Sequence, residues 1–354
     1  MAAERDYVLG TREEELARLG LQHRVWRPVA LDCWQRAGIT VGKRVLDLGA
    51  GPGYAAIDLA EIVGPTGKVV ALERSQNFIR AMETACHARS LANVRIHELD
   101  LMRGDLPKGN YDFAWCRWVV SFVNNQSLLI EKLGRVMPRG SVAIFHEYGH
   151  YETWRFIPRL PMHERFREHV IATWRESGGE PDGALQLPGL LGENGFVIRS
   201  TIPHIFSLGP RDYMWQWPVT FIETYLERLI EVGRIDQKFA EQVRTAVASA
   251  EKNPNARMLT PLVLEIIAEK LSSLVSSCHS YEAQPLCITF QRGYNLPDDV
   301  VEWHSEFFRA ARDVLAAHGA GECLVFHFLF HRADINVMNA FRRADERDSH
   351  DETA

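Results

Sequence analysis

The sequence lacks long apolar runs, a marked excess of one charge and closely spaced cysteines. No apolar stretch reaches the length of about 18 residues that a transmembrane helix needs. Lys and Arg total 40 against 46 Asp and Glu, a net charge of −6, so the chain has no overall basic footprint for nucleic acid or anionic lipid. We therefore expect neither nucleic acid nor a membrane among its partners.

The start of the chain lacks the apolar core of a secretory signal, because residues 1–15 are polar and charged. The six cysteines form no Cys-x-x-Cys pair and are scattered: Cys33, Cys86, Cys116, Cys278, Cys287 and Cys323. In a cytosolic chain such cysteines are free thiols rather than a disulfide framework or a zinc site. We expect a cytoplasmic protein with no bound metal.

What is present is typical of a folded globular chain. Of the 354 residues, 46% are hydrophobic and 24% are charged, which excludes wholesale disorder and a fibrous protein. The length corresponds to roughly two domains. A chain of this size buries a large core without disulfides or metals.

Residues 43–147 alternate between short apolar runs and helical patterns. Before them, apolar spacing predicts helices over Glu13–Leu21 and Arg24–Ala37. The predicted strands are Arg44–Leu48, Lys68–Leu72, Val94–Glu98, Tyr111–Cys116 and Ser141–His146, and the helices between them are Tyr54–Val63, Asn77–Ser90 and Ser127–Met137. This alternation predicts an α/β fold, a Rossmann-like doubly wound and mostly parallel sheet covered on both faces.

Residues 148–194 break this alternation and are rich in Trp, His, Arg and Pro. They read as helical insertions, or a lid, over the carboxyl ends of the strands. Further elements are a strand over Phe196–Ile205, a helix over Arg211–Val232 and an apolar run in Arg257–Ala268. Beyond Lys270 we expect a small α+β appendage and a charged, disordered tail at residues 342–354.

A glycine-rich turn, Val45–Gly53, lies between the first predicted strand and helix. The dinucleotide pattern G-x-G-x-x-G would need a glycine at Tyr54, and a phosphate loop would need Lys-Ser or Lys-Thr after its glycines. The third reading is a nucleoside that carries an amino-acid tail, with Asp47 facing its ammonium group. A plain tight turn stays open as the structural alternative.

Acidic residues follow the strands next to this turn. Glu73 ends the second strand, where a carboxylate can accept hydrogen bonds from both hydroxyls of a ribose. Asp100 follows the third strand and can accept from an adenine amino group, while Leu101 covers the ring. Arg117 follows the fourth strand beside the amino-acid end. A solvated strand end for Glu73 and a helix cap for Asp100 remain as the alternatives.

These residues resemble the class I S-adenosylmethionine-dependent methyltransferases, over about residues 20–270. The turn preceding the fifth strand, residues 135–140, is similar to the family's L-x-P-G-G turn, with Arg139 in place of the first glycine. Residues 229–267 look like the C-terminal part of bacterial small-molecule methyltransferases. The expected cofactor-binding residues are Asp47, Gly49, Gly51, Gly53, Glu73, Ser75, Asp100, Leu101, Arg117 and, folding over from the N-terminal helices, Gln22.

The resemblance sets the expected domain boundaries. A methyltransferase domain over residues 1–270 comprises N-terminal helices (12–38), the core sheet (43–147), an acceptor or lid region (148–235) and closing strands. Residues 271–354 do not resemble the family. An appended subdomain, a lid and the dimerisation element of a homodimer are three open readings of that extension.

Methyl transfer is an in-line displacement, so the protein mainly aligns the acceptor with the methyl group and excludes water. A general base is needed only if the acceptor must lose a proton. After the fifth strand, Glu147, His146 and His150 are the candidates for an acid, a base or an acceptor-orienting group, with structural capping or pairing as the alternative.

Three aromatic residues, Tyr213, Trp215 and Trp217, are candidates to wall an aromatic or apolar acceptor, or simply to pack in the core. We expect a small-molecule acceptor, in the manner of secondary metabolism, with S-adenosyl-L-methionine as cofactor and S-adenosyl-L-homocysteine as product. Two other functions remain: a protein that binds this cofactor without methyl transfer, as a rearrangement catalyst or partner subunit, and methylation of RNA or protein.

Overall fold

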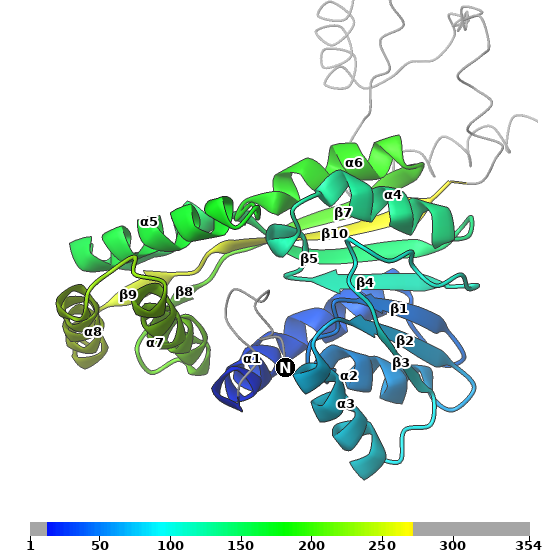
Figure 1. Ribbon diagram of the computed structural model, residues 1–354, viewed down its shortest axis with the longest axis horizontal. Coiled ribbons are helices and arrows are strands. Elements are labelled where there is room, and N and C mark those ends of the chain that lie inside the picture. The colour runs from blue at the N-terminus through cyan, green and yellow to red at the C-terminus, as the bar shows by residue number, and fades with distance from the viewer. Residues whose placement is uncertain (1–12, 272–354) are drawn as a thin grey trace, which may run out of the picture. The chain divides into compact units, whose positions relative to one another are not determined.

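A seven-stranded sheet forms the centre of this computed structural model, which describes residues 13–271 (Figure 1). Its strand order is β3-β2-β1-β4-β5-β10-β7. The strands are β1 (Arg44–Leu48), β2 (Lys68–Glu73), β3 (Val94–Glu98), β4 (Phe113–Arg117), β5 (Val142–His150), β7 (Phe196–His204) and β10 (Leu262–Lys270). The first five strands in this order pair in parallel, whereas β10 is antiparallel to both β5 and β7. The predicted doubly wound, mostly parallel sheet is confirmed.

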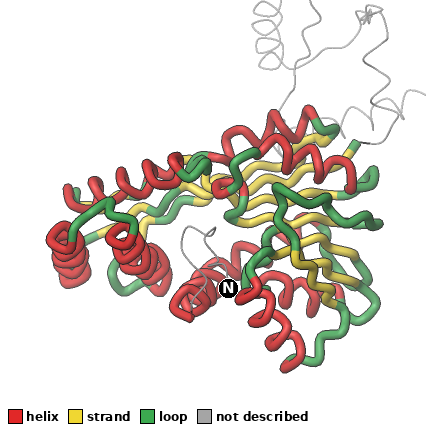
Figure 2. The backbone as a smooth tube through the Cα atoms, viewed as in Figure 1, coloured by secondary structure: helices red, strands yellow, loops and turns green. Residues whose placement is uncertain are grey.

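Helices cover both faces of the sheet (Figure 2). The helices are α1 (Glu13–Ala37), α2 (Tyr54–Val63), α3 (Gln76–Ala88), α4 (Gln126–Val136), α5 (Pro161–Glu176), α6 (Leu187–Glu193), α7 (Gln216–Glu231) and α8 (Gln237–Lys252). One face packs against α1, α2 and α3 through a cluster that includes Trp34, Leu59 and Met82. The other packs against α4 and α6, for example through Leu133 and Leu191.

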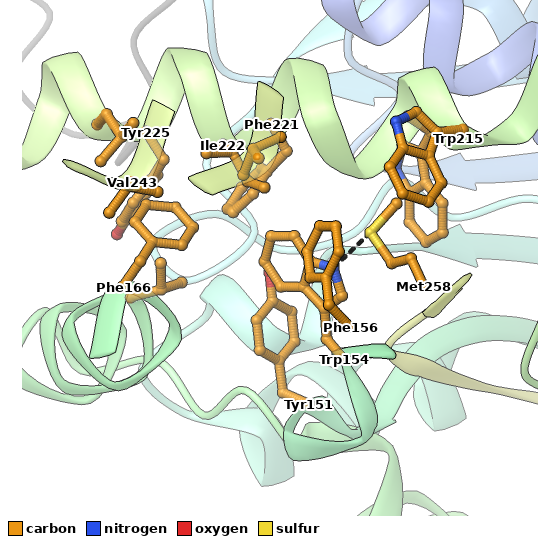
Figure 3. Packing of buried hydrophobic residues seen from close by; sticks show 14 of the residues in the cluster. Tyr151, Trp154, Phe156, Phe166, Trp215, Phe221, Ile222, Tyr225, Val243 and Met258 are labelled. Atoms are coloured by element: carbon orange, nitrogen blue, oxygen red, sulfur yellow. Dashed lines mark hydrogen bonds between the residues drawn. The ribbon is translucent and has the colours of Figure 1, made fainter. Parts of the chain in front are cut away.

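A second core lies beside the sheet, where α5, α7 and α8 pack on a three-stranded sheet of order β6-β9-β8. Its strands are β6 (Arg155–Ile157), β8 (Ser207–Leu208) and β9 (Arg257–Leu259). Aromatic side chains dominate the packing in Figure 3, where the indole N–H of Trp154 donates to the sulfur of Met258 at 3.2 Å. The predicted insertion after residue 148 is therefore divided: β6 and α5 belong to this second core, whereas α6 packs on the main sheet. Helix α8 was not predicted from the sequence.

The N-terminal helices differ from the prediction. Glu13–Leu21 and Arg24–Ala37 form one continuous helix, α1, with Pro28 inside it. The two residues between the predicted helices, Gln22 and His23, are polar but buried and hydrogen-bonded. Apart from Arg18, one turn before Gln22, these partners lie in distant segments. The local spacing of apolar residues therefore showed a gap where the buried face of the helix continues.

Several expectations fall outside the described residues: the appendage and extension at 272–354, the tail at 342–354, and three of the six cysteines. The three that the structure describes, Cys33, Cys86 and Cys116, are buried free thiols. Among the described helices, none has the length and apolarity that crossing a bilayer requires.

Candidate functional site

A cavity of about 420 Å³ opens at the carboxyl ends of β1, β2 and β4, and α1 closes it from the side. Strand β1 lies between β2 and β4, so the strand order reverses at β1. The chain segments that follow β1 and β4 run to opposite sides there and leave a crevice, which is where open α/β sheets bind ligands. Of the ten residues predicted to bind a cofactor, eight line the cavity: Gln22, Asp47, Gly49, Gly51, Glu73, Asp100, Leu101 and Arg117.

The glycine-rich turn forms the cavity floor with three residues of positive φ, at 63° for Gly49, 57° for Gly51 and 85° for Gly53. A Cβ atom at Gly49 would lie 2.6 Å from Val119 Cγ2, and one at Gly53 would lie 2.2 Å from Met82 Cγ. A Cβ at Gly51 would meet nothing within 4 Å. Two glycines thus serve close packing, whereas Gly51 leaves open space on the ligand side.

Glu73 is held in place by backbone donors at the end of β2. Its Oε2 accepts from Gly51 N, and its Oε1 accepts from Arg74 N and Ser75 N, each at 2.8 Å. The side chain is only 8% exposed, and burial raises its pKa against the effect of these donors. A carboxylate has about four acceptor positions and three of them are occupied, so one position remains for a ribose hydroxyl.

Ser75 and Gly53 were predicted to bind the cofactor but do not line the cavity. Ser75 instead donates its N–H to Glu73 and caps α3, its Oγ accepting from Phe78 N at 3.3 Å. Gly53 begins α2 and packs on Met82. Both shape the site from behind.

Two opposite charges face the cavity next to the turn. Asp47 is 2% exposed, and burial raises its pKa to about 7, although Arg117 pulls it down. Burial also disfavours the charged form of Arg117, and it therefore lowers the pKa of this guanidinium to about 10. Among the described residues, Asp47 Oδ2 and Arg117 Nη1 find no hydrogen-bond partner. Unpartnered buried polar atoms are costly, and this pair matches the ammonium and carboxylate of an amino-acid tail.

His23 also lines the cavity, although the sequence did not predict it as a site residue. Its Nδ1 lies 2.9 Å from Arg117 Nη2 and its Nε2 lies 3.0 Å from Asp58 Oδ2. Because arginine only donates, Nδ1 accepts and the ring donates from Nε2 to Asp58, which also accepts from Arg27. Its partners are 94 and 35 residues away, so no local pattern indicated this role.

The far end of the cavity carries Asp100 and Leu101. Asp100 Oδ1 accepts from Met102 N at 2.8 Å, which fixes the loop after β3, and Leu101 is buried beside it. One carboxylate oxygen and an apolar side chain therefore lie where the base of a nucleoside would extend from Glu73.

Aromatic rings wall the end of the cavity next to β4 and β5, namely Trp118, Phe122, Tyr148, Trp174 and Phe221. Trp118 stacks on Tyr148 with ring centroids 6.0 Å apart. The three aromatic residues expected here lie outside the lining. Tyr213 is 52% exposed, Trp215 is buried in the second core, and Trp217 packs behind Trp118. The α7 face that reaches the cavity is one turn further on, at Phe221.

None of the candidates for acid or base chemistry lines the cavity. Successive residues of β5 point to opposite faces of the sheet, so His146 and Glu147 are each fully buried on different sides. His150 is exposed at the end of the strand. The expected cluster of three is therefore dispersed by strand geometry, which the spacing in the sequence did not reveal.

His146 belongs to a polar cluster under α1. Among the described residues, Cys33, His146 and Glu265 form the group of possible metal ligands, with donor atoms within 4.8 Å of one another. Both oxygens of Glu265 are engaged, by Arg36 Nη2 at 2.8 Å and by the Nε2 atoms of His146 and His204 at 3.1 Å. Burial alone would raise the pKa of Glu265, but these donors hold it well below its usual range. The cluster ties α1 to three strands.

The sequence of this chain is similar to those of known methyltransferases. Residues 45–140 match the family model described as a methyltransferase domain. The demethylmenaquinone methyltransferase of Geobacillus kaustophilus is 28% identical over 198 residues, which is 53% of this chain and 83% of that protein. The 2-phytyl-1,4-naphtoquinone methyltransferase of Synechococcus elongatus is 29% identical over 157 residues, 43% of this chain and 61% of that protein. A solved coclaurine N-methyltransferase has a TM-score of 0.43 and 17% identity, covering 68% of this chain and 72% of its own.

Proposed function

This chain is a class I S-adenosylmethionine-dependent methyltransferase, and we propose that its acceptor is a small, flat, largely apolar molecule. The observation that supports this proposal best is that residues suited to the methyl donor and residues suited to the acceptor line the same cavity. Glu73, Asp47 and Arg117 lie at one side, and the aromatic wall around Trp118 lies at the other. A methyl donor gripped by the first set has its reactive end directed at the second.

The residues of the cofactor half divide the work by charge and shape. Glu73 accepts from a ribose hydroxyl, Asp100 accepts from the adenine amino group, and Leu101 covers the ring. Asp47 binds the ammonium and Arg117 the carboxylate of the methionine tail, since Asp47 Oδ2 and Arg117 Nη1 otherwise lack hydrogen-bond partners. When bound, S-adenosylmethionine supplies a sulfonium whose methyl carbon is attacked in line by the acceptor. Gly51 leaves room for the nucleoside.

The acceptor half works by positioning and by excluding water. Its aromatic walls suit a planar molecule and also a positive sulfonium, because aromatic faces attract cations. Tyr148 is the titratable aromatic residue of this wall, and burial raises its pKa, which keeps the phenol protonated at neutral pH. A base in contact with the acceptor is therefore absent from this wall as far as the structure describes it. The acceptor must already be a good nucleophile, such as a neutral amine, a phenolate or an enolate.

The names of the two curated relatives fit this proposal, since both denote methyltransferases of quinone-type molecules. A cofactor-binding protein without methyl transfer, and an RNA or protein methyltransferase, are the competing functions. The aromatic wall of the cavity and the acidic net charge of −6 favour a small molecule over RNA as the acceptor. The cytoplasmic location, the homodimer and the domain boundary near residue 270 stay predictions.

Two measurements test the proposal. Titration calorimetry with S-adenosylmethionine and S-adenosylhomocysteine tests the cofactor half, and a folded sample that binds neither at about 1 mM contradicts it. Transfer of a labelled methyl group to small-molecule extracts, resolved by mass spectrometry, tests the acceptor half. Cofactor binding without transfer would favour the binding protein, and label in RNA or protein would favour a macromolecular acceptor.

A further inference from the structure

The turn after β4 carries much of the acceptor wall. Trp118, Val119 and Phe122 line the cavity from this turn, and Val119 packs against Gly49 of the cofactor turn. Trp118 has a φ of 53°, in the left-handed region that a residue with a side chain rarely adopts. A conformation of this kind persists only where surrounding contacts hold it.

Glu147 supplies those contacts from below the turn. Its Oε1 accepts from Val119 N at 2.9 Å, and the backbone N–H groups of Val120 and Ser121 also act to lower the pKa of this carboxylate. The Cys116 thiol at the end of β4 lies 3.5 Å from the same oxygen. One buried side chain on β5 thus accepts from the backbone of the neighbouring connection at Val119 and lies close to the end of β4 at Cys116.

Glu147 lies behind the turn and does not line the cavity. Its side chain is fully buried, and among the described residues Oε2 has no hydrogen-bond partner. Burying a carboxylate is unfavourable, and burial raises the pKa of Glu147 to about 7 despite the backbone donors. A group with this cost is expected where the contacts it makes are needed for function.

We propose that Glu147 is a positioning residue, whose carboxylate holds the backbone of residues 119–121 and so fixes the pocket wall that this turn carries. The carboxylate acts through the turn and does not touch cofactor or acceptor. This assignment rests on the proposed function, since the wall matters only if the cavity binds both molecules. The positioning role also explains why the Glu147 carboxylate lies close to the cavity without lining it.

Amide hydrogen exchange of residues 119–121 tests the proposal in the full chain without any ligand. Glu147→Ala removes the acceptor of Val119 N and the buried charge beside the next two amides, so the amides of residues 119–121 should exchange at least about 10-fold faster than in the wild-type protein. Glu147→Gln keeps one oxygen that can accept, so its exchange should fall between the two. If Glu147→Ala does not fold, Glu147→Gln against wild type carries the test.

Glu265→Gln is the matched control. Glu265 is equally buried, on the adjacent strand β10, but its carboxylate binds Arg36 of α1 and not the turn after β4. It should leave the exchange of residues 119–121 at the wild-type rate. The affinity for S-adenosylhomocysteine should fall about 3- to 10-fold in Glu147→Ala and recover in Glu147→Gln.

Two results overturn the proposal. In the first, exchange at residues 119–121 is unchanged in both Glu147 variants, or rises no more than in Glu265→Gln. In the second, Glu147→Gln abolishes methyl transfer while exchange and S-adenosylhomocysteine affinity stay at wild-type values, which would make Glu147 a group of the chemistry itself. Failure of the wild-type protein to bind S-adenosylhomocysteine would overturn the proposed function instead and leave the exchange result intact.

Discussion

The guanidinium of Arg117 donates to the imidazole of His23 across 2.9 Å, and this bond joins the end of β4 to the helix that closes the cavity. The acceptor role leaves His23 neutral, and burial lowers its pKa in the same direction. Arg117 is thereby aimed with one terminal nitrogen still unpartnered, next to Asp47. The pairing makes α1 part of the cofactor site rather than a separate cover.

Replacing His23 tests this connection. In His23→Ala the Arg117 side chain loses an acceptor, so we expect S-adenosylhomocysteine to bind about 10-fold more weakly. Arg24→Ala is the control, because Arg24 is exposed on the same helix and donates to Tyr213. Titration calorimetry on both variants decides the matter, and equal affinities would show that Arg117 needs no help from α1.

Asp47 makes cofactor binding depend on pH near neutrality. The folded-state pKa is about 7, so the carboxylate is mostly protonated at pH 6. Only the ionised form pairs with an ammonium group, and the affinity for S-adenosylmethionine should therefore fall about 5- to 10-fold from pH 7.5 to 6. In Asp47→Asn the affinity should be weaker at pH 7.5 and its pH dependence flatter. A slope that is the same in both proteins would assign the titration to another group.

The same raised pKa has the opposite effect on stability. Between about pH 4 and 7 the folded chain keeps the Asp47 proton while the unfolded chain has lost it, so the free energy of unfolding falls as the pH rises through this window. Asp47→Asn removes that contribution. Urea unfolding of both proteins at pH 5 and 7 should show the wild type losing roughly 1 kcal/mol more per pH unit than the variant. A variant with the steeper loss would contradict the assignment.

The glycines of the turn should separate binding from stability. Gly51→Ala meets no atom within 4 Å, so the expected costs are about 1 kcal/mol of backbone strain and a loss of ligand affinity, as the methyl group occupies the ligand side. Gly53→Ala meets Met82 at 2.2 Å and should add an overpacking cost of about 1–3 kcal/mol. Thermal unfolding with and without S-adenosylhomocysteine compares the two. Equal losses of stability would show that Gly51 is packed too.

Glu73 should carry the affinity for the ribose. We expect Glu73→Ala to weaken S-adenosylhomocysteine binding by about 10- to 100-fold, because a charge-assisted hydrogen bond is lost. Glu98→Ala is the matched control, since Glu98 also ends a strand of the sheet but is exposed and outside the lining. Calorimetry that gives Glu73→Ala the wild-type affinity would mean that another group holds the ribose.

The parts of the site that the sequence predicted share one property: they follow from local patterns. Strand ends at Asp47, Glu73 and Asp100 could be placed because apolar runs and turns mark where parallel strands stop. Their convergence then follows from the parallel sheet itself. Of these elements, the turn at Val45–Gly53 and the helix start at Tyr54 match most closely.

The parts that were missed depend on contacts between distant segments. His23 acquires its role from Asp58 and Arg117, and Phe221 reaches the cavity only because α7 packs across α1. Helix α8 had its own signal in the spacing of Phe239, Val243 and Val247. The sequence ended the fifth strand at His146, whereas β5 continues to His150, so Glu147 lies within the strand and not after it. How far each side chain lies from the ligand depends on what covers each face of the sheet.

Helix α1 is anchored to different partners at its two ends, and Pro28 stands between them. Near the start, Gln22 accepts from Trp217 of α7, while near the end Arg36 is bound to Glu265 of the sheet. Proline removes a backbone donor from the helix interior, so bending is easiest there. The first half forms a wall of the cavity and holds Arg117 through His23, so displacing this half at Pro28 would release the guanidinium that faces the cavity while the second half stayed on the sheet.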